Sequence, residues 1–353
     1  MVQDIMVYVS LDTKATPKET LVPLILSLEG AAAYKEYGTY TEFTADFAAE
    51  TAANKAAKAL WDQVAVGSEA MEKVAALGLA QDSDGSAITD ALDTLRDSHD
   101  DWYYLIPAGA TDEQITALAA WAEATVLPEQ ALAEGAKEAE KLLVAQTATS
   151  SLALHNAQTV ICYNPDAENT CMHAAWVGRM VGYYPKSVTW KWKALQGIAP
   201  VDVDAAALGM LLENNVNTYV NNHKRDYMRD GTCADGEYID VVIARWQIKQ
   251  GMRQALTDLF VDTDTIPYDD TGFTMVGAVI IQALNQAAEN GIIRSIDQVP
   301  QFSVAIPRYM DATEEQIAER RMPDIMWSAT LLGGVHGIKV NGRLSIHLSS
   351  EEG

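Results

Sequence analysis

The stretch 102–114, WYYLIPAGATDEQ, predicts a strand that leads into a capped helix. Residues 102–106 form a compact aromatic and aliphatic run, and Pro107 is expected to stop the strand because proline has no N–H to donate. Thr111 and Gln114 then have the spacing of a capping box, in which each side chain bonds the backbone N–H of the other residue. A strand followed by a helix is the unit from which α/β proteins are built.

Similar units lie on both sides of this stretch. Apolar runs at 21–28 and 159–163 predict two further strands. Between the predicted strands, the spacing of apolar residues and the Ala-rich composition predict helices at about 41–63, 88–96, 111–122 and 129–146. Strands that alternate with helices indicate an α/β domain with a largely parallel sheet.

The second half of the chain has a different character, and we expect an α+β arrangement there. Residues 183–199 contain two Trp and three Lys, and we interpret them as the connection between two domains. Beyond them the pattern predicts helices at 204–212, 240–260, 272–290 and 313–321, and extended segments at 216–220, 302–306 and 325–335. The predicted organisation is a strand arm at 1–20, an α/β domain at 21–182, a C-terminal core domain at 183–336 and a β arm at 337–353.

Both ends of the chain are predicted to be β structure that extends beyond the globular part. Near the N-terminus, apolar side chains alternate with others in the period of a strand, at Ile5, Val7, Val9 and Leu11. Near the C-terminus, two alternating runs flank Asn341-Gly342, and this pair is a strong hairpin signal because both residues tolerate positive φ. An ordinary terminal hairpin, packed on its own domain, remains the alternative interpretation.

The charge of the chain excludes several classes of partner. The 353 residues carry 49 acidic and 25 basic side chains, a net charge of −24, which predicts no binding to nucleic acid or to anionic membrane surfaces. No run of ~18 apolar residues is present, so no membrane insertion is expected, and the N-terminus has no basic region typical of a secretory signal. Residues 1–180 hold 27 acidic and 10 basic side chains, whereas 325–349 hold Lys339 and Arg343 and no acid.

The sequence contains no recognisable catalytic set. It has no glycine-rich phosphate-binding motif and no Gly-x-Ser-x-Gly elbow, and Cys162 lies in an apolar strand where a thiol is inert. The acidic loop 82–93 is interpreted as helix-capping, although its oxygen-bearing side chains leave a cation site open. We therefore expect no enzyme and no cofactor. The alternative hypothesis is an uncharacterised soluble α/β enzyme or metal-binding protein.

Several short motifs, in consistent order, resemble one known family. The chain resembles the contractile tail sheath proteins of phage tails, R-type bacteriocins and related injection systems, and the resemblance runs over most of its length. It is carried by YTEFTADF at 40–47, KAAKALWDQ at 55–63, VTWKWKALQG at 188–197, NNVNTY at 214–219, GEYID at 236–240, IPYDDTG at 266–272 and Asn290-Gly291. Each motif is short, and their shared order makes the resemblance specific.

This resemblance implies a mechanical function. Sheath subunits polymerise around an inner tube and contract to drive the tube through a target envelope. Their partners are further copies of the subunit, the inner tail tube protein, and the baseplate and tail-terminator proteins. Assembly in the bacterial host cytoplasm, and a place in a virion tail or bacteriocin-like particle, are implied as well. Phage tail, bacteriocin and injection system remain open alternatives.

The resemblance also implies which residues make contacts between proteins. Strand-adding arms are expected at the N-terminus, at Ile5, Val7, Val9 and Leu11, and at the C-terminus, at Ile338, Lys339, Val340, Arg343, Leu344 and Ile346. The acid-free C-terminal segment would favour docking on an acidic neighbour. A tube-facing helix is expected at 313–321, with Glu315, Glu319, Arg320 and Arg321; an Arg pair that only complements the helix dipole is the alternative.

Overall fold

The computed structural model describes residues 21–63, 71–81, 83–126 and 140–339. Its first part is an α/β body, defined here as the described residues from 21 to 243. The elements of the body that precede α8 are β1 (Val22–Ser27), β2 (Ala32–Tyr37), α1 (Tyr40–Asp46), α2 (Ala52–Trp61), β3 (Val74–Gly78), α3 (Gly85–Ser98), β4 (Trp102–Ala108), α4 (Asp112–Ala124), β5 (Leu142–Thr147), β6 (Thr159–Tyr163), α6 (Met172–Val181), α7 (Ala205–Glu213), β7 (Tyr219–Asn222) and β8 (Arg225–Met228).

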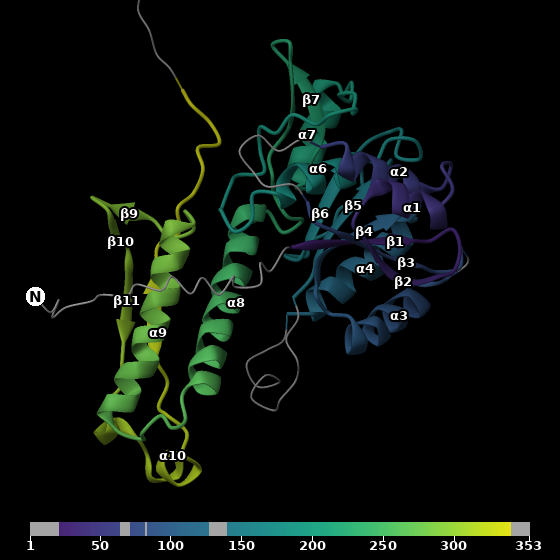
Figure 1. Ribbon diagram of the computed structural model, residues 1–353. Helices are drawn as coiled ribbons and strands as arrows, with labels where there is room; N and C mark the ends of the chain where they lie inside the picture. The colour runs from purple at the N-terminus through teal and green to yellow at the C-terminus, as the bar shows by residue number, and fades with distance from the viewer. Residues whose placement is uncertain (1–20, 64–70, 82, 127–139, 340–353) are drawn as a thin grey trace, which may run out of the picture.

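A six-stranded sheet forms the centre of the body (Figure 1). Its strand order is β2-β3-β1-β4-β5-β6, and every neighbouring pair is parallel except β2 with β3. All six residues of β1 are buried, as expected for a central strand covered on both faces. The predicted α/β fold with a largely parallel sheet is confirmed.

Helices cover both faces of the sheet. On one face, α1, α2 and α6 contribute Phe43, Leu60 and Trp176 to a core that also contains Ile25 and Ile106. On the other face, α3 and α4 bury a second core, which contains Ile88, Leu92, Ile115, Leu118, Leu24 and Leu105. The alternating side chains of each strand supply both cores at once.

The predicted unit at 102–114 forms, but Pro107 does not end the strand. Strand β4 continues to Ala108 and stays paired with β1 from Tyr104 to Ala108, after an irregularity at Tyr103. Strand β5, the other neighbour of β4, pairs only with Tyr104 and Leu105. At Pro107, β4 therefore has no pairing on the β5 side. A proline is tolerated at such a position because no ladder bond on that side needs its N–H. The capping box between Thr111 and Gln114 is present and starts α4 at Asp112.

Two other expectations for the body are corrected. The helix predicted at 41–63 is two helices, α1 and α2, each with its own threonine cap, at Thr39 and Thr51. The helix predicted at 129–146 is wrong for its last part, because Leu142–Thr147 is the fully buried strand β5; residues 129–139 lie outside the described residues. Strands β2 and β3 and helix α6 were not predicted from the sequence. The burial of β5 between β4 and β6 outweighs the local helical composition.

Most of the remaining described residues form an outer unit, defined here as residues 244–332, which lies beside the body (Figure 1). Its elements are the remainder of α8 (Ile239–Asp262), then α9 (Asp270–Glu289), β9 (Ser295–Ile296), β10 (Val299–Pro300), β11 (Phe302–Ala305), a short 3-10 helix at Tyr309–Asp311, α10 (Glu314–Glu319) and β12 (Met326–Ala329). The predicted helices at 240–260 and 272–290 are confirmed, and Gly291 has the positive φ of 73° expected after a helix end.

Helix α8 belongs to both parts. Its first turns place Ile239 and Val242 in the core of the body. Its next turns place Ile248 in a separate core with Ile280 and Leu284 of α9. The domain boundary predicted between 182 and 183 stays a prediction. Trp190, from the far side of that boundary, packs its ring against Trp176 and Tyr104.

Two Gly→Ala changes should have opposite effects, because one glycine lies at the tight contact between α2 and α6 and the other lies in open space on α7. At buried Gly178 in α6 a methyl group would overlap the backbone of Leu60, so Gly178→Ala should destabilise the protein by at least about 2 kcal/mol. At Gly209 in α7 nothing lies within 4 Å, so Gly209→Ala should stabilise it by about 0.5–1 kcal/mol through helix propensity. Urea unfolding of both variants measures the two changes, and equal effects would contradict this packing.

Candidate functional site

Most of the predicted arm residues lie outside the described residues. This holds for Ile5, Val7, Val9 and Leu11 of the N-terminal arm, and for Val340, Arg343, Leu344 and Ile346 of the C-terminal arm. Ile338 and Lys339 are described, without helix or strand, and the Ile338 side chain is 83% exposed. The strand character of both arms therefore stays a prediction.

The predicted tube-facing segment forms an exposed end of the outer unit. Thr313 and Gln316 make the expected capping box, and α10 ends at Glu319. The residue that caps its C-terminus, Arg320, has a φ of 54° in the left-handed region. Arg321 is exposed, with its Nε 3.7 Å from a carboxylate oxygen of Glu319, and its carbonyl oxygen accepts a hydrogen bond of 3.0 Å from the hydroxyl of Tyr268. Glu315 is exposed too, as are Ile317 in the same segment and Tyr309 and Met310 in the 3-10 helix that precedes it.

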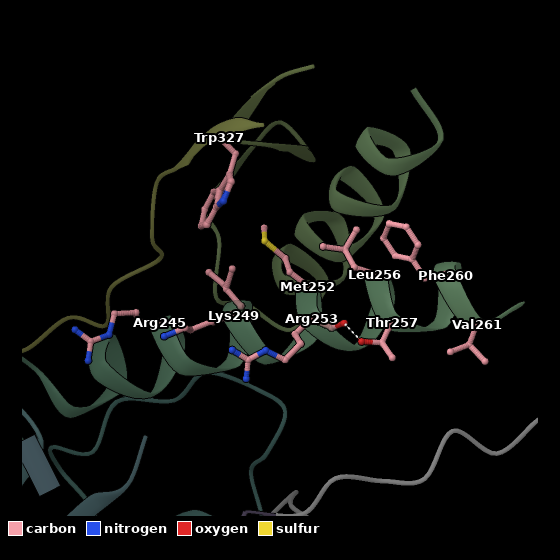
Figure 2. A pocket seen from close by; sticks show the side chains of 10 residues that line it. Arg245, Lys249, Met252, Arg253, Leu256, Thr257, Phe260, Val261 and Trp327 are labelled. Atoms are coloured by element: carbon pink, nitrogen blue, oxygen red, sulfur yellow. Dashed lines mark hydrogen bonds between the residues drawn. The ribbon is translucent and has the colours of Figure 1, made fainter. Parts of the chain in front are cut away.

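An apolar groove of about 710 Å³ runs along α8, and sequence analysis did not predict it (Figure 2). We call it the α8 groove, and its lining residues are Arg245, Ile248, Lys249, Met252, Arg253, Leu256, Thr257, Phe260, Val261 and Trp327. Figure 2 shows Trp327 facing α8 across the groove, with Met252 and Leu256 below it. Phe260 and Val261 are 62% and 76% exposed, an unusual position for large apolar side chains at the end of a helix.

The other wall of the groove is a strand with an open edge. Strand β12 pairs with β11 from Met326 to Ala329, and the pairing sets Trp327 opposite Val304. Val304 and Ala329 pack on the α8–α9 core, so this face of the hairpin points toward the helices. Among the described residues, β12 has no partner on its second edge between Met326 and Ala329. A row of unpaired backbone groups beside an apolar surface can accept a further strand.

A basic row borders the groove. Arg245, Lys249 and Arg253 recur every four residues and so lie on one side of α8. Lys249 and Arg245 contact the carboxylate of Glu140, at 2.8 and 3.6 Å. Burial raises the pKa of Glu140, and Arg245 opposes this rise. These contacts fix the first half of the row against the body, while the guanidinium of Arg245 stays half exposed.

The spacing of the basic row could have been found in the sequence, but the groove could not. Lys and Arg at i, i+4 and i+8 are visible in the printed sequence. The groove needs Trp327 as its second wall, and only tertiary structure brings that residue to α8.

The three cysteine thiols of the chain are buried and protonated, so they do not act as nucleophiles. Cys162, Cys171 and Cys233 are all buried and free. Burial raises the pKa of each thiol, that of Cys171 to about 12, so each stays protonated at neutral pH. The described part of the chain contains no group of three or more His, Cys, Asp or Glu side chains that could hold a metal ion.

The acidic loop at 82–93 supplies a helix cap. The carboxylate of Asp84 accepts a hydrogen bond of 2.8 Å from the backbone N–H of Ala87 and so starts α3. Asp93 accepts one of 2.9 Å from the indole N–H of Trp121. These two carboxylates therefore have structural partners, as the capping interpretation expects. Within the described ranges, no helix combines the length and the apolar character that crossing a membrane requires.

Comparison with known proteins identifies the fold. No protein-family model matches the chain, and no curated protein matches it by sequence. A chain in the baseplate structure of the anti-feeding prophage has 15% identity and a TM-score of 0.71, over 98% of this chain and 100% of that one. A chain of the contracted helical sheath of the same particle has 13% identity and a TM-score of 0.64, with the same coverage.

A second injection system gives a similar result. A chain of the contracted PVC sheath complex, from an extracellular contractile injection system, has 12% identity and a TM-score of 0.65, over 92% of both chains. The chain therefore has the fold found in contractile sheath proteins, and at the level of the fold the resemblance stated from the sequence motifs is confirmed. Nearly the whole chain takes part in the match.

Burial of His173 predicts a loss of stability in acid. Burial lowers the pKa of His173 from 6.5 to about 4, while its Nε2 donates a hydrogen bond to the carbonyl oxygen of Pro107. Below pH 6.5 the unfolded chain takes up a proton that the folded chain refuses until about pH 4, so stability falls across this window. Between pH 7.5 and pH 5 we expect a loss of about 2 kcal/mol from this group.

The measurement is urea unfolding at a series of pH values. His173→Gln should flatten the profile between pH 7.5 and pH 5. His155→Gln, at an exposed position, is the matched control and should keep the wild-type profile. A His173→Gln protein with an unchanged slope would show that other groups control acid stability.

Proposed function

We propose that this chain is the structural subunit of a contractile sheath, which polymerises around an inner tube and contracts to drive the tube through a target envelope. The fold shared with sheath chains over nearly the whole length supports the proposal. The open edge of β12 beside the α8 groove is the observation that carries it, because this surface is incomplete in a single subunit.

An arm from a neighbouring subunit fills this surface. A strand added at the free edge of β12 continues the β11–β12 sheet over α8, and the apolar floor of the groove covers one face of that strand. An alternating strand has one apolar face to bury, as at Ile5, Val7, Val9 and Leu11 in the predicted N-terminal arm. Backbone hydrogen bonds then join one subunit to the next.

Charge favours the N-terminal arm as the strand in the α8 groove. Asp4 and Asp12 flank its apolar run and complement the basic row of Arg245, Lys249 and Arg253. The C-terminal arm carries Lys339 and Arg343 and no acid before Glu351, so the same row would repel it. This arm docks instead on an acidic part of a neighbour, as its charge predicts.

Segment 313–321 faces the inner tube in this proposal. It is the exposed end of the outer unit, and it combines charged groups, including Arg320 and Arg321, with exposed Ile317. The baseplate and the tail terminator contact the first and last subunits of the polymer. The particle is a virion tail or a bacteriocin-like or injection particle, assembled in the bacterial cytoplasm, and the subunit is not an enzyme.

A charge in the α8 groove should block assembly without unfolding the subunit. Phe260→Glu places a carboxylate at a position that is 62% exposed in the single chain but buried under an added strand. We expect the concentration needed for polymerisation to rise at least about tenfold, since burying an unpaired charge is costly. Negative-stain microscopy of cylinders against protein concentration measures this.

The matched control introduces the same residue elsewhere on α8. Gly251 lies outside the groove, and nothing is within 4 Å of its position, so Gly251→Glu should assemble like the wild type. Both variants should have the wild-type melting temperature within a few degrees. Equal assembly by Phe260→Glu and the wild type would overturn the role of the groove. A wild-type protein that stays monomeric at every concentration would overturn the proposed function.

Reversing two charges on the exposed end should detach the tube and leave the sheath intact. The double change Arg320→Glu and Arg321→Glu removes the basic groups after α10, and no described core residue depends on them. We expect polymers of normal length that no longer sediment with purified tube protein. Arg294→Glu, an exposed position elsewhere in the outer unit, is the control and should still sediment with the tube.

A further inference from the structure

After β12 the chain crosses back from the outer unit to the body. The backbone N–H of Leu332 donates a 2.8 Å hydrogen bond to the carbonyl oxygen of Ile292, which belongs to the outer unit. Four residues later, Nε2 of His336 lies 2.8 Å from the hydroxyl oxygen of Thr189, and its ring packs edge-on against Tyr238 with ring centres 4.3 Å apart. Thr189 and Tyr238 belong to the body, where Tyr238 precedes the first turn of α8.

In the segment that crosses back, His336 is the side chain that makes directed contacts with the body. The neighbouring apolar side chains point into solvent, since Val335 and Ile338 are 72% and 83% exposed. His336 itself is only partly exposed. Among the described residues of 333–339, His336 makes the hydrogen bond and the ring contact that hold the segment to the body.

The backbone also fits closely at one point. A Cβ atom added to Gly334 would lie 3.0 Å from Cβ of Thr189, closer than ordinary van der Waals contact. At Gly333 and Gly337 nothing lies within 4 Å. Gly334 therefore lies close to the body, whereas Gly333 and Gly337 have open space around them. None of the three glycines has a positive φ that would itself exclude a side chain.

The charges around His336 are mixed. Asp240 and Asp230 favour its charged form, whereas Lys191 and Lys193 disfavour it. Burial is the largest influence and lowers the pKa of His336, so the ring is neutral at neutral pH. The contact with Thr189 is then a hydrogen bond between neutral groups, and it should depend little on salt.

We propose that His336, with Thr189 and Tyr238, is a clasp that fixes the position and direction of residues 337–339, at the start of the predicted C-terminal arm. The inference rests on the proposed function, in which this segment docks on a neighbour. Without the clasp, the last hydrogen bond that fixes the chain would be that of Leu332. Residues 333–336 would then also have to become ordered when the segment docks. A shorter, oriented tether raises the effective concentration of the arm at its partner. His336 is thus a positioning residue.

Trypsin cleavage of the unassembled full-length chain tests whether the clasp exists. Lys339 is an exposed trypsin site three residues beyond His336, and proteases need several loose residues around the bond they cut. His336→Ala and Gly334→Val should each speed cleavage after Lys339 at least about fivefold, the factor expected for losing one hydrogen bond and one ring contact. Gly333→Val is the matched control and should stay within about twofold of the wild type.

Polymerisation of the same variants tests whether the clasp positions the arm. His336→Ala and Gly334→Val should polymerise only at a concentration at least about fivefold higher, with the wild-type melting temperature, and Gly333→Val should behave like the wild type. Deletion of 338–353 should abolish polymerisation and leave the body folded. These readouts separate positioning from a merely structural role, which would change the melting temperature instead.

The outcomes separate the two proposals. Unchanged cleavage in both clasp variants, or equal acceleration by Gly333→Val, would overturn the clasp. Faster cleavage with normal polymerisation would show that the contact exists and does not position the arm. Normal polymerisation of the deletion variant would overturn the arm's role and the positioning with it. Failure of the sheath proposal would appear differently, as a wild-type chain that forms no cylinders.

Discussion

The structure depends on one helix whose first turns and middle turns belong to different cores. The first turns of α8 are buried in the body through Ile239 and Val242, and its later turns carry the core shared with α9 through Ile248. The buried carboxylate of Glu140 holds this helix by its contacts with Lys249 and Arg245. A buried charge is tolerated only while its partners stay in place, so the ion pairs resist any rotation of α8 against the body.

This constraint explains how the outer unit can present its surfaces at fixed positions. The α8 groove, the open edge of β12 and the segment around α10 are all attached to the body through α8 and through the crossing at His336. Both connections meet the body at the start of α8, because Tyr238 immediately precedes that helix. If the chain is the sheath subunit proposed above, these connections would carry a displacement of the outer unit to the body.

Local signals made much of the fold predictable from the sequence. The capping boxes at Thr111 and Thr313, and the apolar periodicity of the two long helices, depend on residues close together in the chain. Strand β5 was mispredicted, and the course of β4 through Pro107 was missed, because both depend on which strands pair across the sheet. The groove was missed for the same reason: Trp327 and Leu256 are distant in sequence and form one surface only after folding.

The open edge of β12 has a consequence for the length of a polymer built from this chain. If each subunit completes the sheet of a neighbour, every internal edge is filled, but the last layer of a growing cylinder always retains unfilled ones. The subunits alone do not limit the growth of such a polymer, since its last layer offers the same unpaired edges at any length. The number of layers must therefore be measured by something other than the subunit, and the final edges must be covered by a protein that offers a strand without presenting another edge.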